Sequence, residues 1–184
     1  KAPFGAAALA ALLISCFGHA AAEKASAVQI YNAPEMNLVE VDRSILDQVG
    51  VGGHINFAAY VLSDYSIINS LRSAAEKGAR VRLYLDPREL ARLTLSPDHP
   101  FVKLAHTRNV EIKVKSADEG LMHLKAYSVN GVMLRTGSAN ESRPGLERQD
   151  NDLVIITDKG VVTTFDRKFE AMWARPSNSG FSYP

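Results

Sequence analysis

The sequence predicts an α/β fold in which helices flank both faces of a mixed β-sheet. Residues 54–85 read as strand, helix and strand, with an amphipathic helix between two apolar runs. This spacing is typical of a βαβ unit, whose two strands lie parallel. The dipeptide Asn130-Gly131 stands between two runs of alternating apolar residues, which predicts an antiparallel hairpin. Parallel and antiparallel pairs together imply a mixed sheet.

Strands and helices alternate along the first third of the chain. Val28–Tyr31 is expected to be a short strand that ends before Pro34. Asp42–Val49 is expected to be a helix that stops at the glycines of 50–53. His54–Leu62 has little polar interruption, which predicts a strand that is buried on both faces.

The helix of the βαβ unit is predicted over Ser66–Lys77. Its apolar face is formed by Ile67, Ile68, Leu71 and Ala75. Gly78 suits the C-cap of this helix, because glycine readily adopts the left-handed conformation found there. Val81–Leu85 then alternates as a strand and ends at Asp86-Pro87.

Shorter elements make up the second half of the chain. A helix is expected over His99–Thr107, and strands are expected over Val110–Val114 and Leu153–Ile156. The last helix, Val161–Trp173, has one apolar face. Residues 177–184 contain Ser, Gly and Pro without an apolar pattern, so we expect a flexible tail.

The hairpin gathers polar side chains at one end. A two-residue type I′ turn at Asn130-Gly131 would pair Val129 with Val132, Tyr127 with Leu134, Lys125 with Thr136, and His123 with Ser138. Opposed residues share a sheet face, which would carry His123, Lys125, Thr136 and Ser138, with Asn140 just beyond. The other face would carry Leu124, Ala126, Arg135 and Gly137. A histidine, a cation, hydroxyls and an amide together suit an anionic, oxygen-rich substrate.

These residues resemble a known signature. His123-Leu-Lys125, Asn130 and Gly137-Ser138-Ala139-Asn140 are similar to the HxKx4D and GSxN motifs of the phospholipase D superfamily. The resemblance covers about Val28–Trp173 and is closest to short members with a single HKD motif per chain, which include bacterial endonucleases and mitochondrial cardiolipin hydrolases. It implies a phospholipase D-like α/β sandwich. Asn130 replaces the aspartate of the motif, and we treat this position as structural because both residues suit a turn.

The resemblance also implies roles for individual residues. It makes His123, Lys125 and Asp150 catalytic, with Asp150 orienting the imidazole and Asp152 and Glu147 as rival candidates. It makes Ser138, Asn140 and Gly137 part of a phosphate-binding pocket. No metal-binding motif is present in the sequence, and Lys125 can neutralise phosphate charge, so we predict neither a metal nor another cofactor.

Phosphoryl transfer through a protein nucleophile needs a nucleophile on one side of the phosphorus and an acid on the other. His123 can fill only one of these roles. His54, His99 and His106 have no phosphate-binding residue types around them in the sequence. We therefore expect a homodimer in which two copies of His123 face each other across a two-fold axis, as the single-motif members also imply.

The N-terminus suggests export. Lys1, the apolar run Ala6–Ile14 and the small residues up to Ala22 resemble a secretory signal peptide over 1–22. Domain boundaries of 23–176 follow, with a periplasmic or secreted location. Cys16 also fits a lipoprotein-processing box loosely, which makes a lipid anchor the less favoured alternative.

The net charge does not decide between nucleic acid and phospholipid as the substrate. Without Lys1 the chain has 20 basic and 20 acidic residues, whereas non-specific nucleic-acid binders usually have a basic surface. A local strip could be formed by Lys113, Lys115, Arg135, Arg143 and Arg148. We expect an exported phosphodiesterase that works through a phosphohistidine, with non-specific endonuclease activity slightly ahead of phospholipid hydrolysis. A binding module for phosphate or nucleic acid without turnover is a third possibility.

Overall fold

The computed structural model describes residues 27–181 and 183 of the 184-residue chain. Its strands are β1 (Val28–Ala33), β2 (His54–Ala59), β3 (Arg80–Leu85), β4 (Val110–Val114), β5 (Lys125–Val129), β6 (Met133–Gly137), β7 (Asn151–Ile156) and β8 (Ser179–Gly180). Its helices are α1 (Leu38–Leu46), α2 (Tyr65–Glu76), α3 (Pro87–Ala91), α4 (Pro100–Ala105), α5 (Arg143–Glu147) and α6 (Lys159–Trp173).

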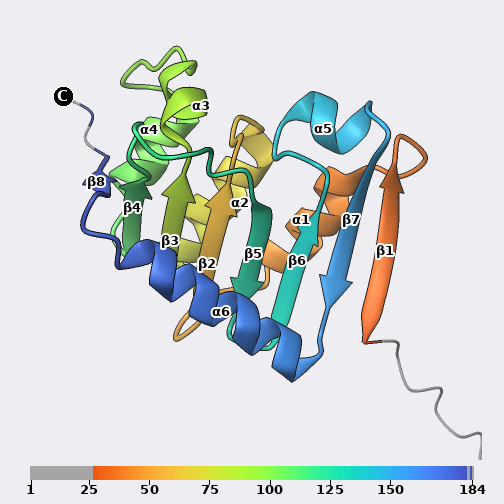
Figure 1. Cartoon of the computed structure of the whole chain (residues 1–184). Helices are drawn as coiled ribbons and strands as arrows, with labels where there is room; N and C mark the ends of the chain where they lie inside the picture. Colours follow the sequence, from red (N-terminus) through yellow and green to blue (C-terminus); the bar gives the residue numbers. More distant parts are fainter. Residues whose placement is uncertain (1–26, 182, 184) are drawn as a thin grey trace, which may run out of the picture.

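All described strands join one sheet. Its order is β1-β7-β6-β5-β2-β3-β4-β8, with β2, β3 and β4 parallel and the other neighbouring pairs antiparallel. Helix α6 crosses one face of the sheet, and α1, α2 and α4 cover the other (Figure 1). The predicted mixed sheet with helices on both faces is therefore confirmed.

The larger core lies between the sheet and the layer of α1 and α2. Ile67, Ile68 and Leu71 of α2 are fully buried there. Helix α2 begins where the Asp64 side chain accepts hydrogen bonds from the backbone N–H groups of Ser66 and Ile67. The predicted βαβ unit thus forms, and it carries the ends of β2 and β3 to the same edge of the sheet.

The hairpin forms with a register that differs from the predicted one. Asn130 and Gly131 both have positive φ, at 55° and 65°, as a type I′ turn requires. However, β5 and β6 pair Tyr127 with Arg135, Ser128 with Leu134, and Val129 with Met133. Val132 is therefore an extra residue in the loop, and it shifts the pairing by one position.

A shift of one residue moves every side chain of a strand to the other face. Arg135 and Gly137 therefore share the face of Lys125, whereas Thr136 lies on the opposite face. The predicted pairing of Lys125 with Thr136, and of His123 with Ser138, is wrong. Leu134 instead packs under α6 with Ala126 and Val162, so the observed register buries an apolar side chain in that layer.

The C-terminal end of the chain is more ordered than the sequence predicts, and the N-terminal end lies outside the described residues. The sequence predicts a flexible tail, but β8 pairs with β4 and the Phe181 ring packs edge-on against Phe101 at 5.1 Å. The proposed leader 1–22 and Cys16 lie outside the described residues. Within the described part, each helix is too short or too polar to span a lipid bilayer.

Candidate active site

His123, Lys125 and Ser138 of the motif lie next to the ends of β2 and β6 and the start of β5, and Figure 1 shows this edge of the sheet at its top. Ala59, the last residue of β2, pairs with Lys125, the first residue of β5. One position further, the backbone N–H of Tyr60 donates to Leu124 O at 2.7 Å. The segment before β5 is therefore held beside Tyr60, and it presents His123 at this edge.

His123 and Lys125 are in direct contact. Lys125 Nζ lies 3.2 Å from His123 Nε2 and donates to His123 O at 3.0 Å. An ammonium group has no acceptor, so Nε2 is the acceptor here and the ring proton lies on Nδ1. His123 is exposed, whereas Lys125 is 8% exposed. Burial lowers the pKa of Lys125, and the nearby Glu141 carboxylate opposes this change.

Ser138 is fixed by β7. Its Oγ donates to Asn151 Oδ1 at 3.0 Å and accepts from the Asp152 N–H at 2.9 Å. The Ser138 N–H donates to Asp152 Oδ1 at 2.9 Å. Hydrogen bonds from Ser138 lower the pKa of Asp152. The hydroxyl is exposed and held in place at the same edge as His123.

Gly137 allows β6 and β7 to approach closely at this point. Its φ is 143°, and a Cβ there would lie 2.4 Å from Asp152 O. An alanine would therefore clash with backbone rather than with a movable side chain. Gly137 therefore permits the close pairing of β6 with β7 that holds Ser138 in place.

A buried network of charged side chains connects the backbone segments that carry the motif residues. Arg135 Nη1 donates to Lys125 O at 3.0 Å and to Ala139 O at 3.2 Å. The same guanidinium bonds both oxygens of Asp42 in α1, each at 3.2 Å, and lies 3.1 Å from Glu141 Oε1. Arg135, Asp42 and Glu141 are all fully buried. One side chain thus connects the segment of Lys125 with the segment that precedes Asn140.

Comparison with known proteins identifies the family. A family model described as "Cardiolipin synthase, PLD-like domain" matches residues 52–173. The chain belongs to this family. The match confirms the resemblance to phospholipase D-like proteins, and it includes every motif residue from His123 to Asn140.

Individual relatives agree with this assignment. The mitochondrial cardiolipin hydrolase of Xenopus laevis is 22% identical over 132 residues, which are 71% of this chain and 60% of that protein. The chain thus spans less than two thirds of that relative. The crystal structure of Nuc, a phospholipase D family member from Salmonella typhimurium, has a TM-score of 0.71 at 19% identity and covers 85% of this chain and 98% of Nuc. NucT from Helicobacter pylori has the same TM-score at 18% identity, covering 84% and 98%. These structures show the fold.

In this PLD-like domain, Asn130 lies at the far end of the hairpin from His123. Its Oδ1 accepts a hydrogen bond from His54 N at 2.8 Å, and its own N–H donates to His54 O at 3.0 Å. Asn130 therefore ties the turn to the start of β2. An aspartate would offer an equivalent acceptor oxygen at this position, which supports a structural role.

The three acidic residues that were candidates for orienting His123 do not contact its ring in the structure. Asp150 is exposed, and no hydrogen bond or ion pair joins it to His123. Asp152 holds Ser138, and Glu147 pairs with Arg143 at 3.1 Å. Within residues 27–181, no carboxylate hydrogen-bonds the His123 imidazole. The role that the resemblance implies for Asp150 stays a prediction.

The sequence did not single out Glu141, which follows Asn140 directly. Burial raises its pKa to about 8, Asp42 acts in the same direction, and Arg135 opposes both. Arg135 Nη1 forms an ion pair with Glu141 Oε1 at 3.1 Å, and Asn140 Oδ1 is buried without a hydrogen-bond partner. Glu141 belongs to no motif. The sequence suggests Arg135 only as part of a basic strip, because the predicted register places it on the face opposite Lys125.

We expect Glu141→Gln to change the pH dependence of stability. The native pKa of about 8 exceeds the unfolded value of 4.5, so the stability from this group is complete below pH 4.5 and is lost as the pH rises towards 8. One such group contributes a slope of at most about 1.4 kcal/mol per pH unit. Urea unfolding of both proteins from pH 5 to 8.5 should show the wild type losing stability relative to Glu141→Gln. Parallel curves would contradict the expectation.

One hollow opens beside His123, and a second adjoins it. One, of about 300 Å³, is lined by Lys115, Leu121, Met122, His123, Leu124, Lys168, Met172 and Arg175. The other, of about 520 Å³, shares Leu124 and Lys168 with the first and is mainly apolar, with Leu134, Val161 and Phe165 in its wall. The site therefore has both cationic and apolar surroundings on the side of α6.

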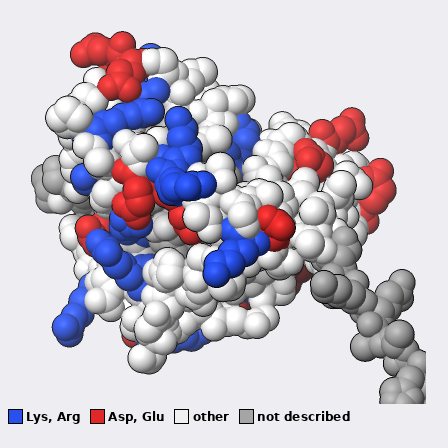
Figure 2. Space-filling model, turned by 60° about the horizontal axis from the view of Figure 1, so that its bottom comes forward, with Lys and Arg blue, Asp and Glu red and all other residues white. Residues whose placement is uncertain are grey.

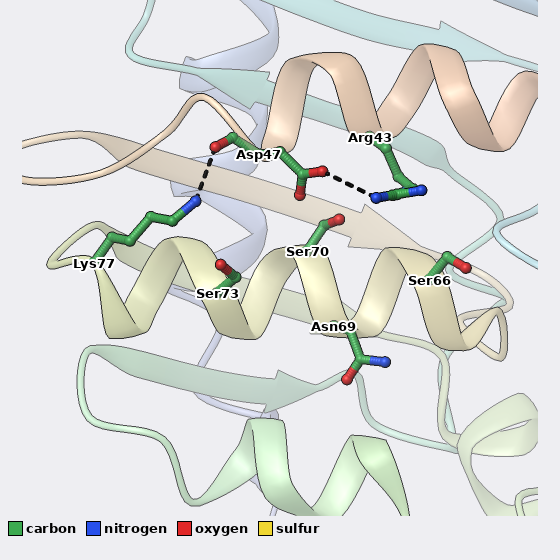
Figure 3. A pocket seen from close by; sticks show the side chains of 7 residues that line it. All are labelled: Arg43, Asp47, Ser66, Asn69, Ser70, Ser73 and Lys77. Carbon is green, nitrogen blue, oxygen red and sulfur yellow. Dashed lines mark hydrogen bonds and ion pairs between the residues drawn. The ribbon is translucent and has the colours of Figure 1, made fainter.

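A third groove, of about 550 Å³, lies between α1 and α2 (Figure 3). It is polar, with several serine side chains, but its cations have partners. Arg43 pairs with Asp47 at 3.5 Å, and Lys77 Nζ donates to Asp47 O at 3.0 Å. No motif residue lines this groove, so we do not assign it to the active site.

The basic strip suggested by the sequence is only partly available. Arg135 is fully buried, Lys113 Nζ donates to Trp173 O, and Lys115 Nζ donates to Gly120 O. Arg143 and Arg148 remain exposed. Figure 2, which looks towards the lower edge of the sheet as drawn in Figure 1, shows basic and acidic side chains interspersed on that face. That face offers no continuous basic track.

Proposed function

We propose that this protein is a phosphodiesterase in which His123 attacks phosphorus and forms a covalent phosphohistidine. The observation that carries the proposal is the contact between His123 and Lys125. The imidazole is exposed, its Nε2 accepts from the Lys125 ammonium at 3.2 Å, and Ser138 is fixed at the same sheet edge. A nucleophile beside a cation and a hydroxyl donor suits a phosphodiester.

The reaction has two steps. In the first, the Lys125 ammonium turns from His123 Nε2 to a phosphoryl oxygen, which frees the Nε2 lone pair. Nε2 then forms a bond to phosphorus while the bond to one alcohol oxygen breaks, and an acid on the opposite side protonates that oxygen. Lys125, with Ser138 and Asn140 as further donors, stabilises the charge on the phosphoryl oxygens. In the second step, the group that acted as the acid, now neutral, takes a proton from a water that attacks phosphorus; the P–N bond breaks, and the second product leaves with its phosphate.

The acid is proposed to be His123 of a second copy. His99 caps α4 by accepting from the Phe101 N–H at 3.1 Å, His106 ends that helix, and His54 bonds Asn130 at the far end of the hairpin. An exposed His123 can meet its counterpart across a two-fold axis. The proposed unit is therefore a homodimer, without a metal ion.

Nucleic acid is the first substrate that we propose, for an exported enzyme. His123 and Ser138 are both exposed, so a polymer strand could lie across the site. Arg143 and Arg148 of the α5 region, together with Lys168, are the cations that could contact its backbone.

Phospholipid is the second candidate, and the apolar hollow favours it. Leu134, Val161 and Phe165 lie next to the cations that surround His123. Such a neighbourhood would suit a molecule that carries both a phosphodiester and an acyl chain.

The test compares substrates with and without EDTA. Single-stranded DNA, duplex DNA, RNA and phosphatidylcholine vesicles are incubated with the purified full chain. We expect cleavage of polynucleotide that persists in EDTA and weakens steeply with salt. Release of head groups without polynucleotide cleavage would favour the second candidate. Loss in EDTA that a divalent ion restores would contradict the metal-free mechanism, and a folded dimer without turnover would leave only a binding module.

A further inference from the structure

The imidazole of His123 lacks the support that a catalytic histidine usually has. Such a ring is normally oriented by a carboxylate or carbonyl on its other nitrogen. In the described part of the chain, the His123 ring contacts Lys125 Nζ and the ring of Tyr60. Among the described contacts, the orientation of the imidazole therefore depends on Lys125 and Tyr60.

Tyr60 contacts both side chains of the HxK motif. Its ring centroid lies 4.5 Å from that of His123, at an interplanar angle of 56°. Lys125 Nζ lies 4.9 Å from the centroid of the same ring. The Tyr60 N–H donates to Leu124 O at 2.7 Å, so the backbone of Tyr60 is held beside the segment that carries the two motif residues.

The far end of the Tyr60 ring lies near a carboxylate. The nearby Glu89 carboxylate of α3 raises the pKa of its phenol. Glu89 in turn pairs with Arg92. The Tyr60 ring thus lies between the motif residues on one side and Glu89 on the other.

We propose that Tyr60 is a positioning residue, whose ring holds the His123 imidazole and the Lys125 ammonium in the arrangement needed for attack on phosphorus. This inference rests on the proposed phosphodiesterase function. The imidazole packs against an aromatic ring, and the ammonium is attracted by the negative charge of the ring face. Loss of the ring would let His123, which is exposed, adopt other rotamers.

Two variants separate the ring from the hydroxyl. Tyr60→Leu removes the ring, whereas Tyr60→Phe keeps it and removes only the hydroxyl. We expect Tyr60→Leu to lower kcat about ten- to hundredfold with a smaller change in KM, and Tyr60→Phe to stay within about threefold of the wild type. The alkaline limb of the pH–rate profile should move to lower pH in Tyr60→Leu alone, since the ammonium loses the ring.

A second measurement does not depend on activity. The carbon-bound protons of the His123 ring lie near an aromatic ring, so their NMR signals carry a ring-current shift. This shift should be present in the wild type and in Tyr60→Phe and be lost in Tyr60→Leu. A Tyr60→Leu protein with wild-type kcat, or with unchanged imidazole signals, would overturn the proposal. A wild type without turnover would overturn the proposed function instead, and the imidazole signals would then decide on Tyr60.

Discussion

Replacing His123 with alanine is expected to lower phosphodiester hydrolysis by at least about 10³-fold, because the variant has no nucleophile. The free energy of unfolding should change by less than about 0.5 kcal/mol, since the side chain is exposed. Initial rates with a chromogenic phosphodiester and urea unfolding curves measure the two effects. Residual activity near the wild-type level would refute the assignment of His123.

The same variant tests the homodimer. With confirmed subunit exchange, excess His123→Ala chains should trap wild-type chains in mixed dimers that lack one histidine. Activity should then fall below the level set by the amount of wild-type chain. Mixed dimers of His123→Ala and Lys125→Ala chains should show poor rescue. If activity simply followed the wild-type concentration, each chain would carry a complete site.

The largest effect on stability is expected for Arg135→Met. The substitution leaves the Asp42 carboxylate buried without its cation, beside a Glu141 side chain that is largely protonated at pH 7. Breaking such a buried pair costs about 3–5 kcal/mol. It also removes the bonds from the guanidinium to Lys125 O and Ala139 O. Urea unfolding at pH 7 measures the loss.

Two controls distinguish a buried charge from lost packing. Arg143→Met removes an exposed arginine that is paired with Glu147 and should change stability by less than about 1 kcal/mol. The triple variant Asp42→Asn, Arg135→Met, Glu141→Gln has no buried charge in the network and should recover much of the loss. A triple variant as unstable as Arg135→Met would mean that charge is not the cause.

Local signals predicted much of the fold. The apolar face of Ser66–Lys77 and the turn at Asn130-Gly131 depend on residues close in sequence, and both elements are present. The hairpin register depends on one residue, Val132, and on which face of β6 each layer can accept. Both faces of β6 are largely covered, so alternation of apolar residues could not choose between the two registers.

In the candidate site too, the sequence predicted the residues of a local motif and missed those that long-range contacts bring together. His123, Lys125 and Ser138 belong to a spaced motif, and the structure brings them to one sheet edge. Tyr60, Asp42 and Glu141 have no motif, because they reach the site only through strand pairing and through the buried guanidinium. Arg135 and Asp42 are 93 positions apart, and contacts at such a separation leave no pattern in a single sequence.

The extra loop residue Val132 fixes the length of this turn, and that length decides on which face of the sheet Arg135 and Leu134 lie. Deleting it would restore a two-residue loop and rotate β6 so that Arg135 entered the apolar layer under α6 and Leu134 met two buried carboxylates. Most surface turns tolerate the gain or loss of a residue. Here an exposed valine, with no part in the chemistry, decides which layer of the protein receives a permanent positive charge. We therefore expect insertions and deletions to be rejected at this turn even though it lies at the opposite end of the hairpin from His123.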